Sequence, residues 1–88
     1  TAWPNPVAGA ARLRLTAREA APARVTLFDV RGRLVRRLFD GPLPAGETTL
    51  EWDGRDDRGD SSAAGLYYVR VERPTRHETR VITLVRVR

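Results

Sequence analysis

The 88-residue sequence predicts an all-β protein, a sandwich of two antiparallel sheets built from about seven short strands. Apolar and polar residues alternate over short runs, as they do on strands that have one buried face. Each run ends within a few residues at Gly, Pro or Asp, so no segment has the length and pattern of a helix. The runs are also rich in β-branched and aromatic residues, which favour strands.

Four strands are expected in the first half of the chain, at residues 3–7, 11–17, 23–30 and 34–39. Pro4 and Pro6 confine the first of them to an edge or a lead-in, because proline cannot donate to a ladder. The side chains expected to point inward from the other three are Leu13, Leu15, Val25, Leu27, Val35 and Leu38. Asp29 and Gly32 predict a tight turn, since Gly32 can take a positive φ.

The second half is expected to contain three more strands, at residues 47–52, 66–71 and 78–88. Residues 40–46 are so rich in Gly and Pro that we expect no regular structure there. Trp52 is the largest candidate for the core, and residues 53–64 are polar enough to form a surface loop. Tyr67, Val69 and Val71 should face inward. The last strand carries apolar residues on both faces, so the pattern leaves its facing open.

Short strands joined by frequent turns in fewer than 100 residues are typical of an immunoglobulin-like or fibronectin-like β-sandwich. The absence of Cys excludes the antibody type with its intersheet disulfide. The length fits one domain, residues 1–88, and the start at Thr1 suggests a fragment of a longer protein. No apolar run approaches the roughly 18 residues needed to cross a bilayer.

All 16 basic residues are Arg, against 11 acidic residues, for a net charge of +5. Without Lys the chain can form neither a Lys–Asn isopeptide crosslink nor a Schiff base. A basic surface could bind nucleic acid. The arginines, however, are scattered along the expected solvent faces and lack the interleaved aromatic residues that stack on bases. We therefore expect no nucleic-acid partner.

No catalytic, cofactor or metal site is expected, and the chain is not predicted to be an enzyme. His77 is the single histidine and lies in a predicted turn, where neither a triad nor a zinc site can be assembled. Four carboxylates in one loop raise the alternative of a calcium site: Asp53, Asp56, Asp57 and Asp60. Their spacing does not match a calcium loop, and Arg55 and Arg58 would offset the charge. We interpret them as turn residues.

An ordered set of motifs runs through the chain: Asn5-Pro6, Val25-x-Leu27-Phe28-Asp29-x-x-Gly32-Arg33-Leu34-Val35-x-x-Leu38, Ala45-Gly46, Trp52-Asp53-Gly54, Gly65-Leu66-Tyr67-Tyr68 and residues 79–86. The set resembles two overlapping families. One is the immunoglobulin-like domain of the flagellar hook-capping protein, and the other is the C-terminal sorting domain of type IX secretion cargo. The residues that carry the resemblance as a fold signature are Gly32, Trp52, Asp53, Gly54, Gly65 and Tyr67.

The resemblance implies a non-catalytic C-terminal sorting or accessory domain of an exported bacterial protein, at the outer-membrane surface or outside the cell. Its partners would be the secretion machinery or other domains of the parent protein. A structural assembly domain of a flagellar hook cap is the first alternative. A carbohydrate or cell-wall binding module is the second, with Trp3 and Tyr68 as stacking residues.

The terminal strand is the candidate surface for partner recognition. Five of its residues form a mixed apolar and cationic face: Arg80, Ile82, Leu84, Arg86 and Arg88. We expect this face to be read by a secretion receptor, or the strand to pair by its edge with a partner strand. The alternative is that the strand merely completes a sheet.

Overall fold

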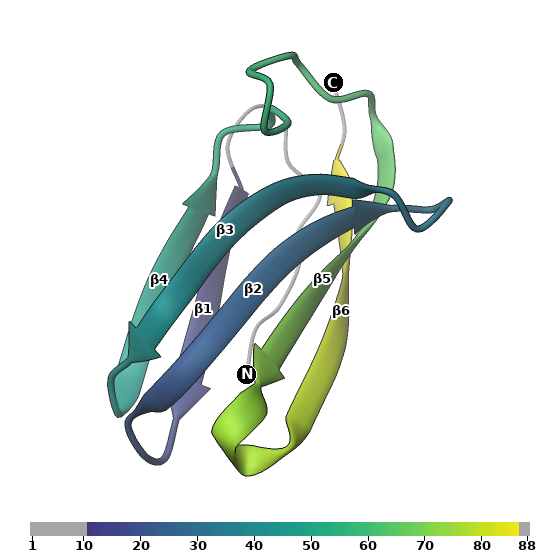
Figure 1. Ribbon diagram of the computed structural model, residues 1–88. Helices are drawn as coiled ribbons and strands as arrows, with labels where there is room; N and C mark the ends of the chain where they lie inside the picture. Colours follow the sequence, from purple (N-terminus) through teal and green to yellow (C-terminus); the bar gives the residue numbers. More distant parts are fainter. Residues whose placement is uncertain (1–10, 87–88) are drawn as a thin grey trace.

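The computed structural model describes residues 11–86, which form two antiparallel sheets packed face to face (Figure 1). The described residues contain six strands: β1 (Ala11–Ala17), β2 (Ala21–Asp29), β3 (Leu34–Leu43), β4 (Gly46–Trp52), β5 (Gly65–Arg73) and β6 (Glu78–Arg86). A short 3₁₀ turn, η1 (Pro74–Arg76), joins the last two. The strand expected at residues 3–7 lies outside the described residues, as does Arg88.

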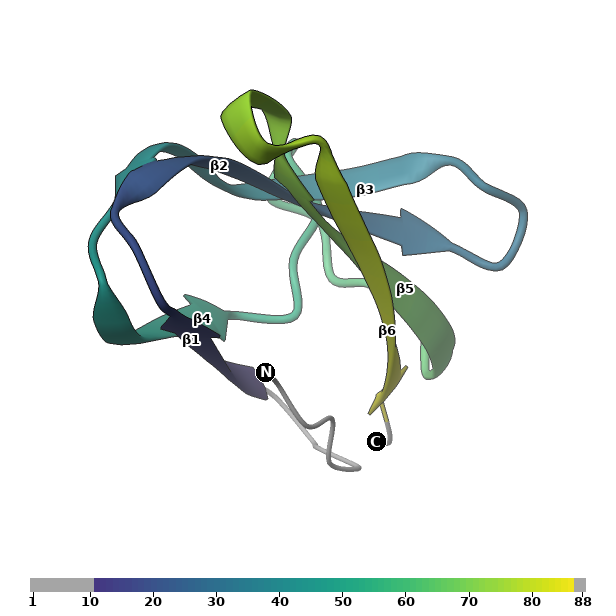
Figure 2. The ribbon, with the colours of Figure 1, turned by 90° about the horizontal axis from the view of Figure 1, so that it is seen from below.

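β1 pairs with β4 in a two-stranded sheet, and the second sheet has the order β3-β2-β5-β6. The chain crosses between the sheets after β1, after β3 and after β4, so the two layers are interleaved in sequence (Figure 2). The β2–β3 turn and the loop of residues 53–64 lie at one end of the sandwich (Figure 1). The prediction of an all-β immunoglobulin-like sandwich is confirmed, with six strands in the described part of the chain.

Trp52 forms the centre of the core, as predicted, and its side chain is completely buried. Its ring meets that of Tyr67 edge-on, with centroids 5.1 Å apart, a geometry that aromatic pairs favour. The indole N–H donates to the backbone carbonyl of Arg55 at 2.8 Å, so the one polar group of the buried ring is satisfied. The residues expected inward from β1, β2 and β5 are also buried.

The prediction that residues 40–46 have no regular structure was wrong. β3 continues through Pro42 to Leu43, and β2 begins at Ala21 and includes Pro22. Pro42 is tolerated because β3 lies at the edge of its sheet and pairs only with β2. The two prolines face each other in the ladder, so the missing N–H groups fall on a single residue pair. Leu43 is 3% exposed, and its burial favours the extended strand over a loop.

The structure decides the facing of β6. Leu84 is buried and Ile82 packs against the core, whereas Val81 on the opposite face is 61% exposed. Apolar residues on both faces of this strand left the sequence pattern unable to predict which face is buried. The position of β6 over the core selects the face that carries Leu84.

Candidate recognition surface

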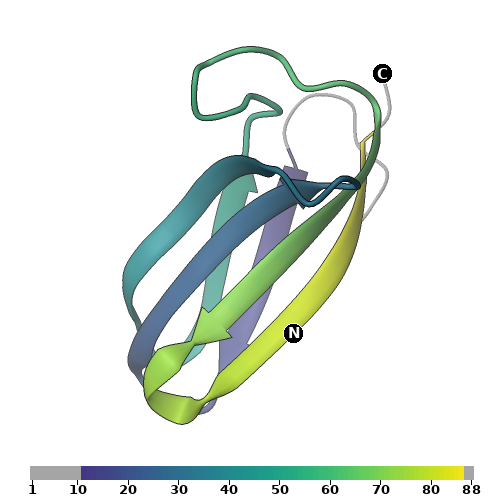
Figure 3. The same ribbon diagram turned by 45° about the vertical axis from the view of Figure 1, so that its right-hand side comes forward.

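β6 is an edge strand. It pairs with β5 along its whole length, from Arg73↔Glu78 to Gly65↔Arg86, and has no second partner strand among residues 11–86. Figure 3 brings β5 and β6 forward and shows β6 on the outside of the four-stranded sheet. The outer edge of such a strand presents backbone N–H and C=O groups to which an additional strand can bind.

The inward face of β6 holds the sandwich together. Leu84 is a core residue, 1% exposed, and is therefore not available to a partner of the folded domain. Arg86 places its guanidinium carbon 5.6 Å from the centroid of the Trp52 ring and donates from Nε to the carbonyl of Ser62 at 3.0 Å. Of the five residues predicted to recognise a partner, Arg80 is exposed and Ile82 is partly buried. The predicted face is thus largely a packing face.

The outward face of the same sheet is mixed in character. Phe28 of β2 pairs with Tyr68 of β5, and both side chains are partly buried. The Arg70 guanidinium lies over the Phe28 ring at 4.6 Å and forms an ion pair with Glu72 at 3.2 Å. Tyr68 was also the candidate for stacking on a sugar, and its proposed companion Trp3 lies outside the described residues.

The carboxylates of the 53–64 loop stabilise the loop itself. Asp53 accepts hydrogen bonds from the backbone N–H of Arg55 at 3.0 Å and from the Arg36 guanidinium at 3.1 Å. Asp56 accepts from two backbone N–H groups later in the loop, at 2.9 and 3.0 Å. The hydrogen bonds to backbone N–H groups place Asp53 and Asp56 in turns, as the sequence predicted. Residues 11–86 contain no group of three side chains placed to hold a metal ion.

The β2–β3 turn is built around Asp29 and Gly32. The Asp29 carboxylate accepts the backbone N–H groups of Arg31 and Arg33 at 2.9 and 3.0 Å, and Arg33 adds an ion pair at 3.1 Å. The hydrogen bond from the Arg33 N–H is the main reason why the pKa of Asp29 is lowered below 3.8, although burial acts in the opposite direction. Gly32 has φ +82°, which L side chains rarely adopt.

Gly54 was predicted to be a signature residue, and the structure adds a reason for glycine here that the sequence did not reveal. Its φ is +82°, and a Cβ at this position would lie 2.7 Å from the guanidinium carbon of Arg86. Gly54 is therefore required by its backbone conformation, and a Cβ there would also displace the Arg86 guanidinium that lies against Trp52. Gly65, the last glycine of the predicted signature, is the first residue of β5.

His77 lies in the turn between the last two strands, as expected. It ends η1 in a left-handed conformation with φ 52°, and its backbone N–H donates to the carbonyl of Pro74 at 3.2 Å. Its side chain is exposed. The position has the character of a solvated turn.

Two antiparallel sheets in this order, with a buried Trp between them, define an immunoglobulin-like β-sandwich domain. The family model described as FlgD Ig-like domain matches residues 5–76. The chain therefore belongs to the FlgD Ig-like domain family, a family of structural, non-catalytic domains. No curated protein sequence matches the chain.

Solved structures from two bacterial systems share the fold. The chain is 21% identical to latent PorU of Porphyromonas gingivalis, with a TM-score of 0.74 over 99% of this chain and 9% of PorU. It is 24% identical to PorZ, a surface component of the type IX secretion system of the same organism, with a TM-score of 0.69 over 100% of this chain and 11% of PorZ. FlgD of Xanthomonas campestris is 28% identical, with a TM-score of 0.63 over 85% of this chain and 55% of FlgD.

The chain thus spans 9% to 55% of the length of these solved proteins. Among residues 11–86, no helix is long and apolar enough to cross a membrane.

Proposed function

We propose that residues 1–88 form a single non-catalytic sorting or accessory domain of an exported bacterial protein, and that secretion machinery contacts it through β6. The observation that carries the proposal is the position of β6 at one edge of the four-stranded sheet, where it has no second partner strand among residues 11–86. The similarity to parts of PorZ and PorU, which are much longer chains of a secretion system, supports a role as one domain of a larger exported protein. The cell surface or the extracellular space is the corresponding location.

Recognition through β6 would use its edge and its outward face, because the inward face is occupied by the core. A partner strand added to the edge would gain backbone hydrogen bonds, and side chains beside it would supply specificity. Val81 is exposed on the outward face, and Arg80 is exposed although it shares the face of Ile82 and Leu84, so the two residues offer an apolar and a cationic contact. Substitution of both residues by Glu should weaken binding of the partner without unfolding the sandwich.

The test is export of a reporter protein fused to residues 1–88 in a bacterium with a type IX secretion system. Deletion of β6 is unsuitable, because it removes the buried Leu84 and would unfold the domain. A double variant, Arg80→Glu with Val81→Glu, should abolish export and leave the circular dichroism spectrum unchanged. Arg12→Glu on the opposite sheet is the matched control, since its side chain is 79% exposed. Undiminished export of the folded double variant would refute recognition through β6.

A structural role in a flagellar hook cap is the second candidate, favoured by the 28% identity to Xanthomonas campestris FlgD over 85% of this chain. If this reading is right, a FlgD chimera that carries residues 5–76 in place of its own immunoglobulin-like domain should restore swarming to a strain that lacks FlgD. A chimera that accumulates normally and leaves the cells non-motile would count against it.

A further inference from the structure

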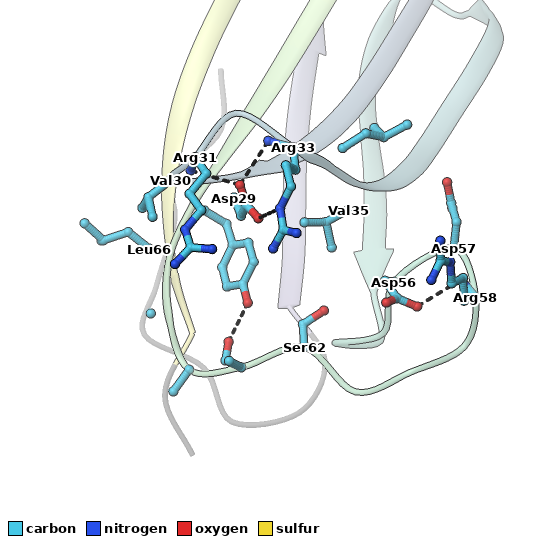
Figure 4. A pocket seen from close by; sticks show the side chains of 15 residues that line it. Asp29, Val30, Arg31, Arg33, Val35, Asp56, Asp57, Arg58, Ser62 and Leu66 are labelled. Carbon is cyan, nitrogen blue, oxygen red and sulfur yellow. Dashed lines mark hydrogen bonds and ion pairs between the residues drawn. The ribbon is translucent and has the colours of Figure 1, made fainter.

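A cleft of about 590 Å³ lies between the β2–β3 turn and the loop of residues 53–64 (Figure 4). Its volume falls in the range of pockets that accept small molecules or a few side chains, roughly 300 to 1,000 Å³. The backbone N–H of Asp57 donates to the carbonyl of Val35 at 2.9 Å, so the loop is fixed to the start of β3. The two walls of the cleft are therefore held at a defined distance.

Exposed apolar side chains gather at this cleft. Residues 11–86 expose four large hydrophobic side chains: Val30, Leu34, Leu66 and Val81. The first three of these line the cleft, with exposed fractions of 60%, 41% and 45%. They come from the turn, from β3 and from β5, so local sequence does not explain why they meet. A concentration of exposed apolar side chains in one place is typical of an interaction site.

The same cleft is lined by Arg31, Arg33 and Arg58. The three carboxylates of the cleft are already engaged. Asp29 is bound to Arg33 and to the turn, Asp56 accepts backbone N–H groups of its own loop, and Asp57 forms ion pairs with Arg36 and Arg37 of β3. Within residues 11–86 the guanidinium groups of Arg31 and Arg58 have no ion-pair partner. In Figure 4 the side chains of Arg31 and Arg33 extend from the turn toward the loop, with Leu66 at one end and Arg58 at the other.

We propose that this cleft binds an extended segment of a partner protein that carries both carboxylate and apolar side chains. Charge complementarity determines the choice of occupant: guanidinium groups without an acidic partner bind carboxylates, often with two hydrogen bonds. The apolar residues Val30, Leu34 and Leu66 bind the side chains between the acids. The site lies at the loop end of the sandwich and is independent of the edge of β6.

The experiment titrates the ¹⁵N-labelled 88-residue chain with a blocked five-residue peptide of alternating Glu and Leu, and follows the backbone amide signals by NMR. Saturable shifts should be confined to residues 29–35 and 56–66, with half-saturation on the order of 1 mM. Peptides in which Lys replaces Glu, or Ser replaces Leu, are the controls and should bind much more weakly. Inorganic phosphate should not reproduce the shifts.

Two variants test the residues assigned to the cleft. Arg31→Ala combined with Arg58→Ala should weaken binding roughly fourfold, because each exposed ion pair contributes about a factor of two. Leu66→Ser should weaken it further, and Arg12→Ala on the opposite sheet should leave it unchanged. The proposal is overturned if no saturable shifts are seen or if the shifts are centred on β6. It is also overturned if the Lys peptide, the Ser peptide or phosphate binds equally well, or if the folded cleft variants bind the Glu–Leu peptide as the wild type does.

Discussion

Substitution of Gly54 by Ala tests the contact between Gly54, Arg86 and Trp52. An alanine at φ +82° is strained by about 1 to 2 kcal/mol. Its Cβ would also lie 2.7 Å from the guanidinium carbon of Arg86, so the guanidinium must shift, and we expect it to leave the Trp52 ring. The lost cation–π contact is worth about 0.5 to 1 kcal/mol, and the lost hydrogen bond to Ser62 about 1 kcal/mol. The total is about 3 kcal/mol of unfolding free energy.

A double-mutant cycle separates the two effects. In an Arg86→Ala background the new Cβ meets no guanidinium, and Gly54→Ala should cost only the backbone strain of about 1 to 2 kcal/mol. The coupling energy between the two positions should therefore be about 1.5 kcal/mol. Urea unfolding followed by far-ultraviolet circular dichroism measures all four variants. If Gly54→Ala lowers the unfolding free energy by the same amount with and without Arg86, within about 0.5 kcal/mol, the added Cβ does not disturb the contact between Arg86 and Trp52.

Three further predictions concern the core and the β2–β3 turn. Leu84→Ala should lower the unfolding free energy by about 2 to 4 kcal/mol, whereas Val81→Ala on the opposite face of β6 should change it by less than about 0.5 kcal/mol in urea melts; equal effects would show that the facing of β6 is wrong. The pKa of Asp29 is lower in the folded state than its usual 3.8, so its stabilisation is present above about pH 4 and is lost as the pH falls through the folded value. Thermal melts from pH 2 to 6 should therefore show a weaker acid destabilisation in Asp29→Asn than in the wild type, and identical pH profiles would argue against the bound carboxylate. Gly32→Ala should cost about 1 to 2 kcal/mol in urea melts through strain alone, because no atom lies within 4 Å of the added Cβ; a neutral effect would contradict the left-handed turn.

The sequence alone determined which residues of the regular strands point inward. Alternation in β1 and β5 correctly predicted that Leu13, Leu15, Tyr67 and Val69 are buried, because the side chains of a strand point to opposite faces in turn. Turn chemistry was equally local. The turn position of Gly32 could be predicted from the residues next to it, because the hydrogen bonds of this turn span only a few residues.

Tertiary structure alone decided the features that depend on distant partners. β3 continues through Gly41 and Pro42, residue types that usually end strands. It can do so because β3 lies at a sheet edge and the side chain of Leu43 is buried in the core. β6 carries apolar residues on both faces, and only its place over the core buries Leu84. The contact of Gly54 with Arg86, in another strand, adds to the requirement set by its positive φ, and the cleft exists because two separate connections meet at one end of the sandwich. The alternation of apolar and polar residues predicts which face of a strand is buried. Which strands lie beside it depends on pairing between segments that are distant in the sequence.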